Sequence, residues 1–100
     1  LRSFLASQKN AYVVCGDRHW QYHSVHPEDG IQEFCCGPAS DPHAGGWNQK
    51  DYREDYHRFL RVKGGYLSVL SERKDSGAPG LTFRHHKENG EIVNEVAFGE

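Results

Sequence analysis

The chain has 100 residues, of which 36% are hydrophobic and 12% aromatic, and its formal net charge at pH 7 is -2. This length allows one domain with a small core, in which the aromatic side chains would bury much of the apolar surface. The near-balanced charge offers no basic surface for nucleic acid or for an anionic membrane. No segment approaches the roughly 18 consecutive apolar residues that cross a bilayer. The sequence therefore favours neither kind of partner.

The first residues predict a missing upstream segment. The chain contains no Met, starts at Leu1 and opens with LRSFL, which is typical of the end of a helix whose beginning lies upstream. We expect the chain to be the C-terminal piece of a longer protein.

An apolar segment followed by a Gly-Asp-x-His box is the most informative feature. Residues 11–15 predict a fully buried strand, and Gly16, Asp17, Arg18 and His19 follow it directly. Glycine at a strand end permits close backbone approach, and the residues after it then point into a crevice. A carboxylate and an imidazole two residues apart can bind one cation or two neighbouring ones. By itself the box is short enough to be an ordinary polar surface turn.

Two hairpins are predicted from turn dipeptides between β-favouring segments. Asp29-Gly30 lies in the first, and Asn89-Gly90 in the second favours a two-residue type I′ turn. The paired segments are residues 20–26 with 31–35, and residues 81–87 with 91–98. A further strand over residues 65–71 is expected to be largely buried, because apolar side chains fall on both of its faces.

Between these hairpins the pattern is less regular. Residues 37–46 are turn-forming throughout and predict a long loop. Apolar residues from 51 to 60 recur at helical spacing and predict a short amphipathic helix, although residues 58–62 could equally begin a strand. Expected strands outnumber helices by about six to two, which predicts an α+β, β-dominated fold of mostly antiparallel strands and hairpins.

The three cysteines leave at least one thiol unpaired, and we expect all three to be free. Cys35 and Cys36 would point to opposite faces of a strand and are poorly placed for a mutual bridge. Cys15 is most simply a small buried hydrophobic residue, and a bridge from it to Cys35 or Cys36 is the less favoured alternative.

The succession of these segments resembles the C-terminal part of the PhoD-like phosphatases, the alkaline phosphatase D-type metallophosphatases. The resemblance covers roughly residues 10 to 98, and its segments are YVVCGDRHWQYHSV, EFCCGPASDPHAGG, GGYLSVLSERK and LTFRHHKENGEIV. It implies a metal-dependent phosphoesterase with a four-layer α-β-β-α fold, which hydrolyses phosphomonoesters or phosphodiesters and is secreted or periplasmic in many members. Residues 1–100 would be a single C-terminal fragment of the catalytic domain.

In related metallophosphatases the last metal motif carries a Gly-His-x-His pair. Here Asp17 stands where the first His would be, as in the alkaline phosphatase D subgroup, and His19 matches the second. The resemblance implies that both are metal ligands and catalytic groups. A hard anionic ligand suits calcium or iron better than a purely zinc site, with manganese also compatible. Two-metal phosphoesterases need further ligands, which this chain lacks, so we expect the fragment alone to be inactive and not necessarily to hold metal.

Three further residues are weaker candidates for substrate binding. Arg18 could donate two hydrogen bonds to a phosphate group or could point to solvent. Trp20 could shape a pocket, although an aromatic residue beside a buried strand more often joins the core. Trp47 lies in a glycine-rich loop, which favours a role in a pocket or lid.

The remaining histidines favour structural interpretations. Asp41-Pro42-His43 repeats the D-x-H spacing but follows no strand, which favours a solvated loop. Strand alternation places His19 and His23 on one face and His26 on the other, which argues against a zinc site built from the three. His85 and His86 are expected on a strand surface.

Two rival functions stay open. The first is a stand-alone β-rich binding module in which the box is a structural turn and the glycine-rich loop meets a partner; it predicts an ordinary stable monomer with no response to metals. The second is a single-metal binding domain, which rests on the seven histidines and is disfavoured by their placement. In the fragment, exposed edges of a truncated sheet could also cause self-association.

Overall fold

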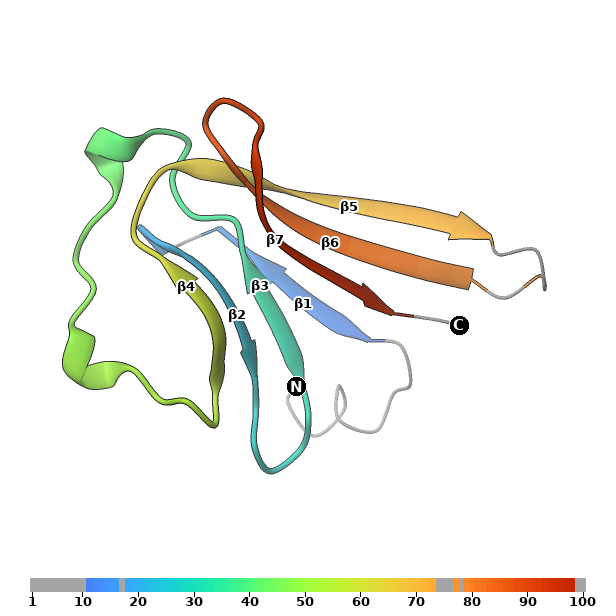
Figure 1. The fold of residues 1–100 in the computed structure, drawn as a ribbon. Coiled ribbons are helices and arrows are strands. Elements are labelled where there is room, and N and C mark those ends of the chain that lie inside the picture. Colours follow the sequence, from blue (N-terminus) through green and yellow to red (C-terminus); the bar gives the residue numbers. More distant parts are fainter. Residues whose placement is uncertain (1–10, 17, 74–76, 78, 99–100) are drawn as a thin grey trace.

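The computed structural model describes residues 11–16, 18–73, 77 and 79–98, whose fold is drawn in Figure 1. The regular structure in these residues consists of seven strands and two short 3₁₀ helices. The strands are β1 Tyr12–Cys15, β2 Gln21–Val25, β3 Gln32–Cys35, β4 His57–Arg61, β5 Gly65–Arg73, β6 Pro79–Lys87 and β7 Ile92–Phe98, and the 3₁₀ helices are η1 Asp41–His43 and η2 Gln49–Asp51. The β-dominated architecture is therefore confirmed. No helix in the described ranges is long and apolar enough to cross a membrane.

The strands form two sheets (Figure 1). The first sheet has the order β1-β3-β2-β4, in which β1 and β3 run parallel and the other neighbours antiparallel. The second sheet has the order β5-β6-β7 and is antiparallel throughout. The long loop between β3 and β4 runs along the β4 side of the first sheet (Figure 1). The expectation of mostly antiparallel strands is confirmed.

The β2–β3 hairpin is confirmed, with its loop over residues 27–30. The amide of Gly30 donates to the carbonyl oxygen of His26 at 2.8 Å, and the amide of His26 donates to the carbonyl oxygen of Ile31 at 3.0 Å. Gly30 has φ 73°, which a glycine adopts without steric cost. The hairpin therefore follows the box closely, although β2 begins at Gln21, one residue later than predicted.

The β6–β7 hairpin is also confirmed, but its predicted two-residue type I′ turn is wrong. The amide of Gly90 donates to the carbonyl oxygen of Lys87 at 3.0 Å, which makes Glu88 and Asn89 the central residues of the β-turn. Gly90 follows them with φ 95°. The loop therefore spans residues 88–90, and the pairing register shifts at His85/His86. A turn followed by a left-handed glycine and a bulge is the usual geometry of this longer loop.

The helix predicted for residues 51–60 is wrong, and the alternative of a strand in this segment is correct. The helical hydrogen bonds are confined to η2 and to one turn in which the amide of His57 donates to the carbonyl oxygen of Arg53 at 2.7 Å. From His57 onward the chain pairs with β2 as β4. Pairing along the edge of an existing sheet thus outweighs a weak local preference for helix.

The core lies between the two sheets and is built mainly from aromatic rings. Phe34 on β3 stacks on Phe83 on β6 with a centroid distance of 4.1 Å, and both side chains are buried. His23 stacks on the other side of Phe34 at 4.2 Å, while Tyr12 packs against Phe98 at 4.7 Å. We call the face of the first sheet that carries Phe34 its inner face and the opposite one its pocket face.

The surface location expected for the two adjacent histidines of β6 is wrong, because both are buried. His85 donates from Nε2 to the carbonyl oxygen of Cys35 at 2.9 Å, and its Nδ1 accepts from Asn94 at 3.4 Å. Burial lowers the pKa of His85 to about 4, which keeps the ring neutral at pH 7. His86 bonds through Nδ1 to the carbonyl oxygen of Gly90 at 2.9 Å. Hydrogen bonding to these partners is what allows the two polar rings to be buried.

The predicted burial of strands β1 and β5 is also wrong. Strand β1 was expected to be fully buried, yet Val14 beside Phe34 is 55% exposed. Strand β5 was expected to be largely buried, yet Val69 beside Phe83 is 46% exposed. Both strands lie at sheet edges, and β5 and β6 extend beyond the first sheet (Figure 1). Apolar residues on both faces of a strand therefore did not indicate a buried strand.

Candidate functional site at the end of strand β1

The Gly-Asp-x-His box follows β1 where this strand lies beside the end of β3. The amide of Cys36 donates to the carbonyl oxygen of Cys15 at 3.0 Å, and a Cβ on Gly16 would lie 3.0 Å from the Cys36 sulfur. A larger residue at this position would therefore require the Cys36 side chain to shift. His19 is exposed, and its carbonyl oxygen accepts from the amide of Gly45 at 3.0 Å. Asp17 lies outside the described residues, so its role as a ligand stays a prediction.

A hollow of about 660 Å³ opens beside the box, and we call it the box hollow. Two segments far apart in the sequence form it, one from the box and one from the loop that follows β3. Its lining residues are Gly16, Arg18, His19, Pro38, Ala39 and His43. The box and the GPAS loop, which carry the most specific part of the sequence resemblance, thus contribute to one surface depression.

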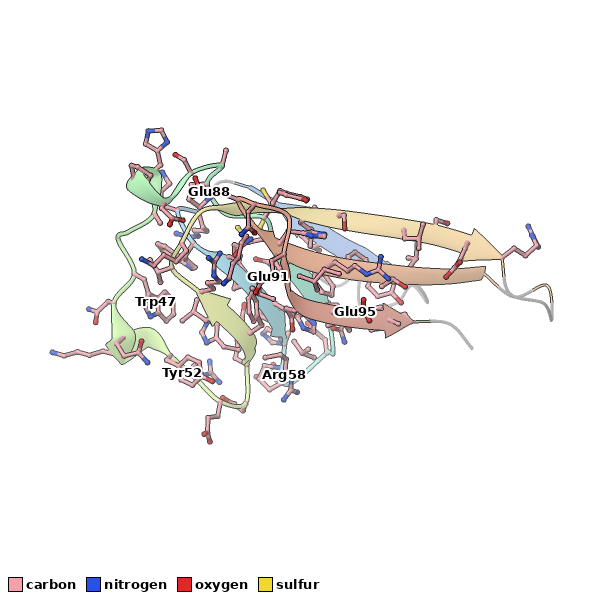
Figure 2. The ribbon with its side chains drawn as sticks, turned by 45° about the horizontal axis from the view of Figure 1, so that its top comes forward. Trp47, Tyr52, Arg58, Glu88, Glu91 and Glu95 are labelled. Atoms are coloured by element: carbon pink, nitrogen blue, oxygen red, sulfur yellow. The ribbon has the colours of Figure 1, made fainter. Side chains whose placement is uncertain are left out.

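A second hollow, of about 530 Å³, shares Arg18 with the first, and we call it the aromatic pocket. Its lining residues are Arg18, Trp20, Tyr22, Glu33, Gly46, Trp47, Asn48, Tyr56 and His57. Trp47 lies where the long loop passes β4 (Figure 2). All three residues predicted as weaker substrate-binding candidates therefore line this pocket together.

The walls of the aromatic pocket are rings in mutual contact. Trp20 and Trp47 meet edge to face with a centroid distance of 5.3 Å, and Trp47 meets His57 in the same manner at 5.3 Å. The guanidinium carbon of Arg18 lies 5.8 Å from the centroid of the Trp20 ring. This distance is within the range of a cation–π contact, so the Trp20 face already accepts a positive group.

Behind these walls, a carboxylate lies on the pocket face of the first sheet. Glu33 on β3 accepts a hydrogen bond at Oε2 from the Tyr22 hydroxyl, and the Cys15 thiol lies 3.8 Å from the same oxygen. Burial, together with hydrogen bonds to Cys15 and Glu33, raises the pKa of Tyr22 far above its usual value. Burial also raises the pKa of Cys15 to about 12. Both groups stay protonated at neutral pH and can donate to the carboxylate.

Sequence reasoning missed Tyr22, Glu33 and His57 as pocket residues. A usable signal for Glu33 was present, because the alternation of side chains in β3 places it on the face opposite Phe34. No comparable signal existed for His57, whose segment was read first as a helix. Its position depends on the pairing of β4 with β2, where His57 lies opposite Ser24.

The side chains around the box hollow determine whether a metal ion could bind there. His19 and His43 both line it, and His43 is bonded through Nδ1 to the Ser40 hydroxyl at 3.2 Å. The Asp41 carboxylate instead accepts from the amide of Gly64 at 2.7 Å and so holds the loop against the β4–β5 connection. Within the described ranges, no three His, Cys, Asp or Glu side chains are grouped so that they could hold a metal ion. These residues do not by themselves make a two-metal centre.

All three cysteines are free thiols in this structure. Cys15 and Cys35 are partners in the parallel β1–β3 register, whereas Cys36 follows the end of β3. Burial raises the pKa of Cys36 as well. The prediction of free thiols agrees with this arrangement.

Comparisons with family models, with curated proteins and with solved structures gave no match to this chain.

Proposed function

We propose that the chain is the C-terminal portion of a metal-dependent phosphoesterase of the PhoD-like type. In the intact protein, Asp17 and His19 of the box would supply metal ligands. The observation that carries this proposal is the box hollow, which brings Arg18 and His19 together with Pro38 and Ala39 of the GPAS loop. The two most specific segments of the sequence resemblance would thus serve one site.

The residues of the chain suit distinct tasks at such a site. A bound iron, calcium, zinc or manganese ion would supply Lewis acidity and lower the pKa of a bound water. Arg18 is exposed and lines both hollows, so its guanidinium can donate to the oxygens of a phosphate ester from the edge of the box hollow. Trp20 and Trp47 would then contact the organic group of that ester in the adjacent aromatic pocket.

The proposed parent fold is a four-layer α-β-β-α sandwich, in which the two packed sheets would be the inner layers. Half-exposed valines on the facing surfaces support a larger core than this chain builds. Val14 shares a face with Phe34, and Val69 shares one with Phe83, yet both valines remain accessible. Further protein packed over these edges would bury them.

The proposal predicts negligible phosphoesterase activity for the 100-residue chain alone, because one carboxylate and one imidazole cannot hold two metals. Hydrolysis of p-nitrophenyl phosphate and bis-p-nitrophenyl phosphate would be followed with added calcium, iron, zinc and manganese. Metal-dependent turnover by the chain alone that disappears in Asp17→Asn would contradict the proposed division of the site.

The role of the box is tested in the intact protein. Asp17→Asn and His19→Ala should lower phosphoesterase turnover by orders of magnitude and leave the melting temperature within a few degrees, because ligands at a strand end act on chemistry more than on the core. His43→Gln is a matched control, since His43 lines the same hollow but is not a proposed ligand. If the box were a structural turn, the two substitutions would lower stability and spare the activity per folded molecule.

The alternative function is a binding module in which the box is a structural turn. The aromatic pocket favours it, because its rings and its carboxylate lie on described strands and loops and need no metal. Phosphoesterase activity of the intact protein that depends on Asp17 would exclude this alternative.

A further inference from the structure

We infer that the aromatic pocket is a binding site for a small organic cation of the alkylammonium class. The inference rests on Glu33, Tyr22 and the rings of Trp20, Trp47 and Tyr56, and it does not depend on the proposed hydrolytic function. It goes beyond that function because it concerns the second hollow and a ligand of opposite charge to phosphate.

The charge on Glu33 is the first reason. Its Oε2 atom receives hydrogen bonds from the hydroxyl of Tyr22 and the thiol of Cys15, which are neutral donors. Across the described part of the chain, no Lys, Arg or His side chain forms an ion pair with Glu33. A half-buried carboxylate without a cationic partner is costly to desolvate, and a bound cation would supply the missing charge.

The composition of the walls is the second reason. Aromatic faces attract cations through the ring quadrupole, and cages of Trp and Tyr are the usual way in which proteins bind quaternary ammonium groups. The Arg18 guanidinium over Trp20 shows that this ring accepts a positive group in the structure itself. The volume of about 530 Å³ also falls within the range of small-molecule pockets, roughly 300–1,000 Å³.

An anionic ligand is the opposite possibility, because Arg18 lines the same pocket. The difference in exposure between the Arg18 guanidinium and the Glu33 carboxylate favours a cation as the ligand. Arg18 is exposed, whereas Glu33 is half-buried and bonded to the buried Tyr22. Within the pocket, the charge that solvent screens least is therefore negative.

The two ligand classes make opposite predictions for substitutions in the pocket. Glu33→Gln should abolish binding of a cation, whereas Arg18→Gln should strengthen it by removal of a like charge. For an anion, Arg18→Gln should abolish binding and Glu33→Gln should strengthen it. Glu95→Gln is a matched control, because Glu95 lies on β7 of the second sheet, away from Trp47 (Figure 2).

The experiment uses the intrinsic fluorescence of the 100-residue chain, whose only two tryptophans both line the pocket. Choline would be titrated at constant ionic strength, and the uncharged alcohol with carbon in place of the choline nitrogen would serve as its isostere. We expect a saturable change in emission with choline, an affinity about tenfold weaker for the alcohol, and loss of choline binding in Glu33→Gln but not in Glu95→Gln. Inorganic phosphate should give no saturable change.

Several results would overturn the inference. Equal affinities for choline and the alcohol would show that only apolar contact operates. Choline binding that weakens in Arg18→Gln would show that the Arg18 charge does not oppose the bound cation, and phosphate binding in place of choline binding would identify an anion site. If Glu33→Gln did not fold, the direction in which the choline affinity changes in Arg18→Gln would still distinguish a cation site from an anion site. Arg18 is exposed, so its removal leaves the core intact.

Discussion

Glu33 and Phe34 are neighbours in β3, yet they lie on opposite faces of the first sheet and in different chemical surroundings. Phe34 is buried between two stacked rings, His23 on its own sheet and Phe83 on the other. Glu33 lies on the pocket face, where protonated Tyr22 and Cys15 donate to its carboxylate. The inner face therefore holds the two sheets together, whereas the pocket face carries charge beside a cavity.

This difference separates stability from function along one short strand. A buried side chain on the inner face, such as Phe34, can be replaced only at the expense of packing, because its neighbours fill the space around it. A side chain at the pocket can change charge without loss of packing, since part of its surroundings is solvent. Substitutions on the two faces should consequently differ in which property they alter.

The largest effect on stability is expected for Phe34→Ala. Phe34 is fully buried, and its removal should lower the free energy of unfolding by about 3–5 kcal/mol through lost burial and a residual cavity. Val14→Ala is a matched control, because Val14 is the register partner of Phe34 but is 55% exposed; its effect should stay within about 1 kcal/mol. Urea unfolding of both variants measures the difference. Similar losses for both would show that burial of the Phe34 ring is not the main source of stability.

Acidification should next weaken the packing between the two sheets, through His85 on β6. Burial lowers the pKa of His85 from its ordinary value of 6.5 to about 4 in the folded chain, so between these values the unfolded chain binds a proton that the folded chain does not. Stability is thus unaffected by this group above pH 6.5 and falls as the pH decreases toward 4, by about 3 kcal/mol in total. Burial also lowers the pKa of His23, so this group contributes to the loss of stability in the same direction.

The contribution of His85 can be isolated by urea unfolding between pH 7 and pH 4 in His85→Gln and in His43→Gln. The first variant should be less dependent on pH than the unchanged protein, although less stable at pH 7. The second should behave as the unchanged protein does, because His43 is exposed. A pH dependence that persists undiminished in His85→Gln would contradict the assignment.

The smallest effect on stability is expected for Glu33→Gln. The amide oxygen of glutamine can still accept from the Tyr22 hydroxyl, so the free energy of unfolding should change by no more than about 1 kcal/mol. The same substitution should abolish cation binding. A loss of stability as large as that of Phe34→Ala would show that Glu33 belongs to the packed structure and not to a binding site.

The number and reactivity of the free thiols provide a further test. Titration under denaturing, non-reducing conditions should give three thiols per chain. In the folded chain the reaction should be slow, because burial raises the pKa of Cys15 to about 12 and also raises that of Cys36. One thiol per chain would instead reveal a disulfide, for which Cys15 and Cys35 are the register partners.

Local sequence signals predicted the two hairpins and the strand before the box, because turn dipeptides and alternation act over a few residues. Asn89-Gly90 located its hairpin although the turn type was wrong, since Gly90 closes a longer loop than the dipeptide suggests. The segment that begins at His57 was misread because its conformation is set by pairing with β2.

Long-range contacts explain what else could not be predicted. His85 and His86 were expected at the surface because nothing nearby in sequence shows that the carbonyl oxygens of Cys35 and Gly90 accept from them. The grouping of Arg18, Trp20 and Trp47 was not predictable either, because Trp47 arrives on the long loop between β3 and β4. Each of these residues was a candidate by its type, but only the fold brings the three together.

The metal content of the intact protein tests the proposed role of the box most directly. Metal equivalents per chain would be measured by mass spectrometry, together with phosphoesterase turnover on the same preparations, for the unchanged protein, Asp17→Asn and His19→Ala. We expect metal and turnover to fall together in both variants, because each would remove a ligand. Full metal content with near-normal turnover in both variants would contradict the assignment of Asp17 and His19 as ligands.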